Sequence, residues 1–134
     1  VPDCAGGFQV YGAGCAGSGG FTPRLWGDGC PAPGGRFELA WTSGLGGAIG
    51  LLLSGGGTGT KTIAPGCELQ ILPLLRPREA FFLFGSGAGG GFQVFDFRLP
   101  ASAPPGDYYL QTVFQDPGGP NGRTVSNPLR MEVR

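Results

Sequence analysis

The sequence predicts an all-β protein: an antiparallel β-sandwich of the immunoglobulin-like or jelly-roll-like kind, with about eight or nine strands in one domain over residues 1–134. Three observations predict this fold class. Short runs alternate apolar with polar residues, clusters of Gly, Pro, Asn and Asp separate these runs, and four cysteines are available for two disulfides. Although the chain has 29 Gly and 13 Pro, 40% of its residues are hydrophobic, so it can bury a core.

The clearest strand is predicted over residues 36–42. Its alternation assigns one set of side chains to the core, namely Phe37, Leu39 and Trp41. After a glycine-rich turn the pattern resumes, and the expected inward set is Ile49, Leu51 and Leu53. We therefore expect two consecutive strands here, each with one buried face.

The middle of the chain offers three more runs. A strand that begins with Leu69 and Ile71 should either end at Pro73 or lie at a sheet edge, because proline cannot donate a ladder hydrogen bond. Residues 80–84 and 92–99 then flank the glycine-rich segment 85–91, which we interpret as a flexible hairpin tip. Both flanking runs are expected to be strands.

The C-terminal part begins with a corner, Pro-Pro-Gly-Asp at residues 104–107. The strand predicted over residues 108–115 starts with Tyr108, and many immunoglobulin-like modules enter a late strand through a similar turn followed by tyrosine. A last strand is predicted over residues 129–133. Its expected inward set is Leu129, Met131 and Val133.

The predicted strand at residues 92–99 breaks the simple alternation. Phe95, Phe97 and Leu99 suit one face, which leaves Phe92 and Val94 on the other. A β-bulge or a covering loop could bury these two side chains within the chain, and this is the simpler expectation. The alternative is that a neighbouring subunit covers them, since exposed aromatic residues on a charge-poor surface mark an interaction patch.

Charge and cysteine usage exclude several classes of protein. Nine basic and nine acidic side chains cancel and are scattered, so neither nucleic acid nor an anionic membrane surface is an expected partner. The longest apolar stretch, residues 48–53, is too short for membrane insertion. With no His and no C-x-x-C spacing, we predict no metal site and no cofactor. Disulfides and a Val1 that suits the start of a processed chain predict a secreted protein, extracellular or at the cell surface.

Several short motifs recur together in a known group of proteins. They are YGAGCAGS at residues 11–18, PGC at residues 65–67, DPGGP at residues 116–120 and SN at residues 126–127. In their order along the chain these motifs resemble an uncharacterised family of secreted, Gly/Pro-rich, β-rich proteins of environmental bacteria. The resemblance implies an exported surface or matrix protein and carries over no catalytic residues.

The same resemblance implies a disulfide pairing, although four cysteines alone allow three connectivities. The motif pair that contains Cys15 and Cys67 recurs together, which implies a bridge between them. Cys4 is then left to pair with Cys30.

The glycines of residues 12–17 also match the G-x-G-x-x-G spacing of dinucleotide-binding loops. That site needs a following helix whose N-terminus faces the phosphates, and residues 18–23, Ser-Gly-Gly-Phe-Thr-Pro, break any helix. We therefore interpret the segment as a glycine turn that brings Cys15 close to a neighbouring strand.

Enzymatic activity is not expected. Without His, the usual general base and triad member is missing, and the only lysine, Lys61, lies in the Gly/Thr-rich segment 55–62, which we expect to be a loop. Paired carboxylates could still support glycoside hydrolysis. Most acidic residues, however, lie beside turns or on polar strand faces, so we nominate no catalytic residue.

The leading functional prediction is a non-enzymatic extracellular structural protein that assembles with copies of itself into a filament, layer or matrix. A neutral, glycine-rich surface resists association only weakly, and strand edges or terminal segments could connect the subunits. The expected connecting elements are the N-terminal segment 1–7 and the terminal strand 129–134. The candidate contact residues are Val1, Phe92, Val94, Leu129 and Met131.

The alternative is a secreted carbohydrate-binding or adhesion module whose partner is a polysaccharide. Such modules stack sugars on exposed aromatic side chains. Alternation places Trp41 in the core, so Trp26, next to a Gly-Asp-Gly turn, is the candidate ligand-binding residue.

Overall fold

The computed structural model describes residues 4–134, with the backbone alone described at residues 75–78. The described part is 55% strand and, apart from two three-residue 3₁₀ turns, has no helix. The strands are β1 (Gly7–Val10), β2 (Arg24–Gly29), β3 (Arg36–Gly44), β4 (Ile49–Gly55), β5 (Thr58–Ala64), β6 (Cys67–Ile71), β7 (Leu74–Phe82), β8 (Gly91–Arg98), β9 (Gly106–Gln115), β10 (Arg123–Val125) and β11 (Leu129–Val133). The 3₁₀ turns are η1 (Ser18–Gly20) and η2 (Pro120–Gly122).

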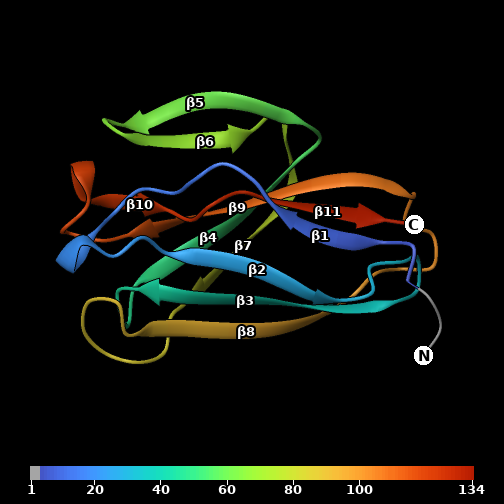
Figure 1. Cartoon of the computed structure of the whole chain (residues 1–134), viewed down its shortest axis with the longest axis horizontal. Coiled ribbons are helices and arrows are strands. Elements are labelled where there is room, and N and C mark those ends of the chain that lie inside the picture. The colour runs from blue at the N-terminus through green and yellow to red at the C-terminus, as the bar shows by residue number, and fades with distance from the viewer. Residues whose placement is uncertain (1–3) are drawn as a thin grey trace.

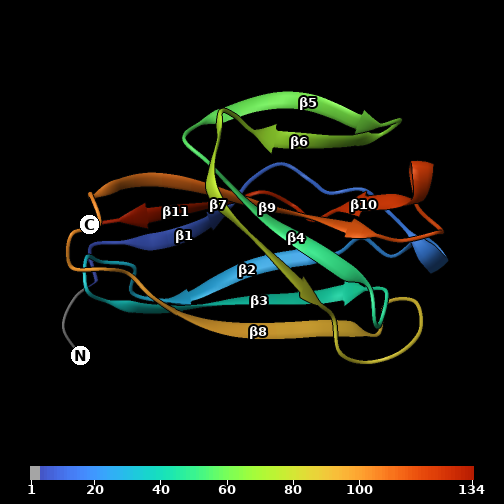
Figure 2. The same cartoon turned by 180° about the vertical axis from the view of Figure 1, so that it is seen from behind.

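These strands form three layers, as Figure 1 shows. The larger sheet has the order β1-β11-β9-β4-β7, with β10 also paired to β9, and the smaller sheet has the order β2-β3-β8. The two sheets pack face to face as a sandwich, and all strand pairs within them are antiparallel. The third layer is the hairpin of β5 and β6, which covers the outer face of the larger sheet (Figures 1 and 2).

The order of the strands is immunoglobulin-like. In that notation β2, β3 and β8 occupy the places of strands A, B and E, while β4, β9 and β11 occupy those of C, F and G. At the start of β9, the Tyr108 hydroxyl donates a hydrogen bond of 2.7 Å to the Pro104 carbonyl. A tyrosine that bonds back to the preceding turn at the start of strand F is the tyrosine corner of these sandwiches. The predicted sandwich is confirmed, and its connectivity favours the immunoglobulin-like alternative.

The main core lies between the two sheets. Phe37, Leu39 and Trp41 are buried there, as their alternation predicted, and so are the inward side chains of β11. Trp41 packs on Phe81 with ring centroids 4.5 Å apart, and its indole N–H donates to the Thr112 hydroxyl at 2.9 Å. The buried indole thus satisfies its only donor.

The prediction for β4 was wrong in part, because this strand is covered on both faces. Leu52 faces the main core, whereas Leu51 and Leu53 face the β5–β6 hairpin, and Ile49 is exposed. A strand buried on two sides shows a continuous apolar run instead of alternation. The covering hairpin also corrects the loop predicted over residues 55–62, most of which belongs to β5.

Both disulfides inferred from the resemblance are present. Cys15 pairs with Cys67, which fixes the turn of the covering hairpin to the segment that follows β1, and Cys4 pairs with Cys30. Beside the first bridge, the Cys15 N–H donates to the Val125 carbonyl at 3.1 Å. Gly12 has a φ of +61°, and η1 follows Gly17 in place of a longer helix. The segment bends at Gly12 and is otherwise irregular, and the expectation that it brings Cys15 close to a neighbouring strand is confirmed.

Segment 85–91 is not the tip of a regular hairpin. Strands β7 and β8 belong to different sheets, and the chain crosses between them with a single bridge, Phe84 to Phe92. The crossing is held from the neighbouring turn, where Gly46 N–H donates to the Gly87 carbonyl at 3.0 Å. This connection brings the last residues of β7 beside the first residues of β8.

The terminal strand cannot serve as a free connecting element. β11 forms as predicted, but it lies between β1 and β9, and Leu129 and Met131 are buried in the core. These two side chains stabilise the chain's own sandwich, so the prediction that they contact a neighbouring subunit was wrong. Val1 lies outside the described residues.

Candidate functional site

The most prominent surface feature is a group of large apolar side chains where β7 and β8 meet. We call it the aromatic band, and its members are each between 49% and 53% exposed. They are Ile49, Phe82, Phe84, Phe92 and Val94. The expectation that a bulge or loop buries Phe92 and Val94 within the chain was therefore wrong.

The strand register makes the aromatic band continuous. Ile49 lies opposite Phe82 in the β4–β7 pair, and the Phe82 and Phe84 ring centroids are 5.2 Å apart. The ring centroids of Phe84 and Phe92 are 6.1 Å apart, and Val94 lies on the same face of β8 as Phe92. The side-chain amide of Gln93 donates to the Phe82 carbonyl at 3.0 Å and ties the two strands together. The aromatic band thus wraps around one lateral side of the sandwich.

A groove lies on the other lateral side, beside β1 and β2. We call it the Trp26 groove. It has a volume of about 300 Å³. It is lined by Val10, Gly12–Gly14, Thr22–Trp26 and Asn127. Trp26 is 39% exposed at its rim, as predicted, whereas Trp41 is buried.

Asn127 closes the backbone edge of β2 next to this groove. Its side-chain amide donates to the Leu25 carbonyl at 2.8 Å and accepts from the Leu25 N–H at 2.9 Å. The side chain thereby takes the place of a neighbouring strand at Leu25. Because the backbone groups of Leu25 are already hydrogen-bonded, a partner in the Trp26 groove would contact side chains there and would not pair with β2 at Leu25.

Three carboxylates line up across the outer face of the smaller sheet. In the strand register Asp28 lies opposite Glu38, and Glu38 lies opposite Asp96. A hydrogen bond with Asp96, and then the negative charge of Asp96, raise the pKa of Glu38 above its ordinary value. Among the described residues no group of acidic or sulfur side chains has the arrangement of a metal site.

This row predicts a pH-dependent stability. Because the pKa of Glu38 is raised in the folded state, the folded chain binds more protons than the unfolded chain, so stability rises as pH falls through this pKa. We expect Glu38→Gln to raise the melting temperature slightly at neutral pH by removing a like-charge contact, and the gain to vanish in acid. Thermal unfolding at several pH values checks this. Glu68→Gln, at an exposed position on β6, is the control and should change little. A gain for Glu38→Gln that persisted in acid would contradict the explanation.

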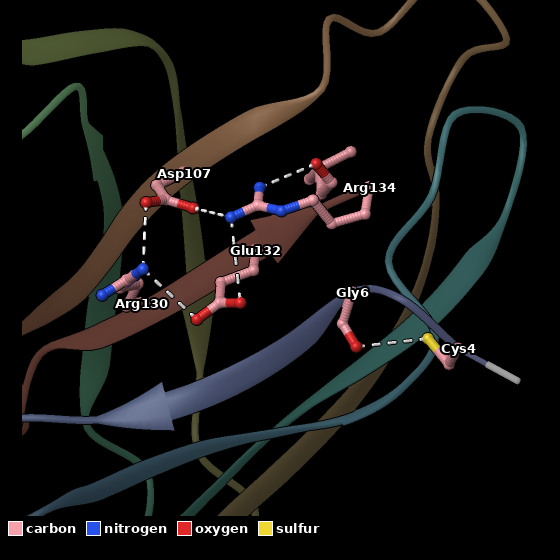
Figure 3. Close-up of polar contacts among 7 residues, drawn as sticks. Cys4, Gly6, Asp107, Arg130, Glu132 and Arg134 are labelled. Carbon is pink, nitrogen blue, oxygen red and sulfur yellow. Dashed lines mark hydrogen bonds and ion pairs between the residues drawn. The ribbon is translucent and has the colours of Figure 1, made fainter.

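Two further carboxylates, Asp107 and Glu132, have charged partners. Asp107 and Glu132 form ion pairs with Arg130 and Arg134, of which the shortest are 2.9 Å and 3.1 Å to Asp107 (Figure 3). These four side chains are each about one-third exposed, and their charges cancel. Such an exposed network contributes little to stability.

Asp116 is held as a buried turn anchor. Burial is the largest single influence on its pKa and raises it, but hydrogen bonds from the Ser18 hydroxyl, the Ser18 N–H and the Gly118 N–H together lower it below its ordinary value. The carboxylate therefore stays ionised and joins the turn after β9 to η1. This role matches the turn position that the sequence indicated.

Comparison with protein-family models, curated proteins and solved structures finds no match. Among the described residues no helix is long and apolar enough to cross a membrane. The surfaces themselves are therefore the basis for any functional conclusion.

Sequence reasoning found part of these surfaces. Phe92, Val94 and Trp26 were nominated and are exposed, but Ile49 was expected inside, and Phe82 and Phe84 were not assigned to a face. Their spacing was an available signal, because residues two apart in a strand share a face. In the run 81–84, Leu83 is buried and Phe82 and Phe84 are exposed.

Proposed function

We propose that this protein is a non-enzymatic extracellular structural subunit that associates with copies of itself through the aromatic band. The observation that carries the proposal is the continuous exposure of five large apolar side chains. At half exposure they present about 500 Å² of apolar surface, a patch size that is often functional in soluble proteins. Two disulfides support an oxidising, extracellular location.

Charge does not oppose this association. The chain has no formal net charge, and no member of the aromatic band is ionisable. Proteins that remain monomeric usually carry a net charge or expose only small apolar patches. Copies of this chain can therefore approach each other with little repulsion.

The test is sedimentation of the native, disulfide-bonded chain over a range of concentrations. We expect wild type to form oligomers as concentration rises, and Phe84→Ser/Phe92→Ser to remain monomeric because each substitution removes apolar surface from the centre of the aromatic band. Phe21→Ser is the matched control, since Phe21 is 48% exposed but lies outside the band. A wild type that stays monomeric at its highest soluble concentration would refute the proposal.

Polysaccharide binding is a second candidate function, favoured by the exposure of Trp26 beside a groove. Sugars stack on the faces of aromatic side chains, and one tryptophan with flanking polar groups is the smallest platform of this kind. Retention on immobilised polysaccharides, compared between wild type and Trp26→Ala, tests it.

A further inference from the structure

We infer that the copies associate in one direction, head to tail: the aromatic band of one copy docks into the Trp26 groove of the next. This inference rests on the self-association proposed above and adds the second surface and the direction of assembly. The occupant of the groove is a second copy of this chain.

The two surfaces lie on opposite lateral sides of the same sandwich. Strands β7 and β8 are edges of their sheets on one side, and β1 and β2 are edges on the other (Figures 1 and 2). The aromatic band follows the first pair of edges, and the Trp26 groove follows the second. A contact between unlike sides leaves one of each surface free at the ends of every open oligomer.

The surfaces also lie at the same level along the strands. Trp26 is opposite Ala40 in the β2–β3 pair, and Ala40 is opposite Val94 in the β3–β8 pair. A copy displaced sideways across the strands would thus bring its Trp26 beside Val94 of the first copy. The apolar row across the smaller sheet, formed by Trp26, Ala40 and Val94, would continue from one copy into the next.

The chemistry of the next row fits the same displacement. Both β2 and β8 run antiparallel to β3, so they run parallel to each other. Arg24 lies two residues before Trp26 in β2, and Phe92 lies two residues before Val94 in β8. Among the described residues that line the groove, Arg24 alone is charged. Sideways docking would place its guanidinium near the exposed Phe92 ring, where a cation is attracted to the ring face.

The two surfaces differ in shape. The Trp26 groove is concave and is lined partly by the backbone of Gly12–Gly14, while the aromatic band consists of side chains that protrude into solvent. A contact between two different surfaces of one molecule is heterologous, and it propagates into an open chain unless its rotation closes a ring. The inferred contact therefore generates a polymer without further elements.

The experiment uses two kinds of variant, each of which retains one of the two surfaces. Phe84→Ser/Phe92→Ser disrupts the aromatic band, and Trp26→Glu places a charge in the Trp26 groove. Val10→Glu is a second groove variant, at a lining residue of β1. Each variant alone should be monomeric. An equimolar mixture of a band variant and a groove variant should give a one-to-one heterodimer, because one intact band meets one intact groove. Native mass spectrometry can resolve the two chains by mass, and near-ultraviolet circular dichroism checks that each variant is folded.

The outcomes separate this inference from the proposed function. If wild type oligomerises and folded groove variants still form oligomers by themselves, the band pairs with another band and the inference is overturned. If groove variants associate normally but lose retention on polysaccharide, the groove is a sugar site and the inference is again overturned. If wild type is monomeric throughout, the proposed function itself fails.

Discussion

Replacing Cys15 and Cys67 together by alanine is expected to lower the free energy of unfolding by about 4 kcal/mol. The two cysteines are 52 positions apart, and the chain-entropy model assigns about this value to a loop of that length. Both side chains are also buried, with Ala64 and Val125 around them. Urea denaturation of wild type and the double variant measures the loss.

The Cys4–Cys30 bridge provides the control for this prediction. Its separation of 26 positions corresponds to about 3.5 kcal/mol on the same model, but it lies at the N-terminal end of the sandwich, away from the hairpin. Hydrogen exchange of β5 and β6 should accelerate when Cys15 and Cys67 are replaced, and should change much less when Cys4 and Cys30 are replaced. Equal acceleration in both variants would show that the first bridge has no local role in holding the hairpin.

Much of the sandwich could be predicted because its strands obey local rules. In β3 and β11 one face carries the large buried side chains and the other carries mainly polar or small ones, so the hydrophobic pattern alone assigns Phe37, Trp41 and Met131 to the core. The Pro-Pro-Gly sequence likewise predicts the turn before Tyr108. These features depend on near neighbours in the chain.

The third layer could not be predicted, because it depends on contacts that are distant in sequence. The hairpin of β5 and β6 covers Leu51 and Leu53 from the outer face of the larger sheet. Two faces of β4 are then buried, and the run of three leucines gives no sign of which face each one joins. The exposure of Ile49 follows from the same arrangement, since it lies at the first position of β4.

The burial of polar residues such as Gln111 could not be predicted from the sequence either. Gln111 is fully buried and links three segments: its amide donates to the Ser126 carbonyl at 2.9 Å and to the Glu68 carbonyl at 3.1 Å, and accepts from the Gln70 N–H at 2.8 Å. A glutamine in an alternating strand reads as a solvent-facing residue. Its role appears only in the folded chain, where its hydrogen bonds join β9 to β6 and to the segment before β11.

The same sandwich predicts unlike effects for its two tryptophans. Trp41→Ala is expected to lower the free energy of unfolding by about 4 kcal/mol, because a large side chain that is 1% exposed leaves a cavity against Phe81 and Phe95. Trp26→Ala, at a 39% exposed position, should change it by no more than about 0.5 kcal/mol. Chemical denaturation of the two variants, under conditions in which both are monomeric, makes the comparison.

Two further variants separate the packing of Trp41 from its hydrogen bond. Thr112→Val keeps the indole in place but removes its acceptor, and burying an unpaired N–H should cost about 1–3 kcal/mol. Trp41→Phe removes the N–H together with part of the ring, so it should cost less than Trp41→Ala and leave only the Thr112 hydroxyl unpaired. If Thr112→Val had no effect, the 2.9 Å contact would contribute nothing to the core, and the stability of this region would depend on aromatic packing alone.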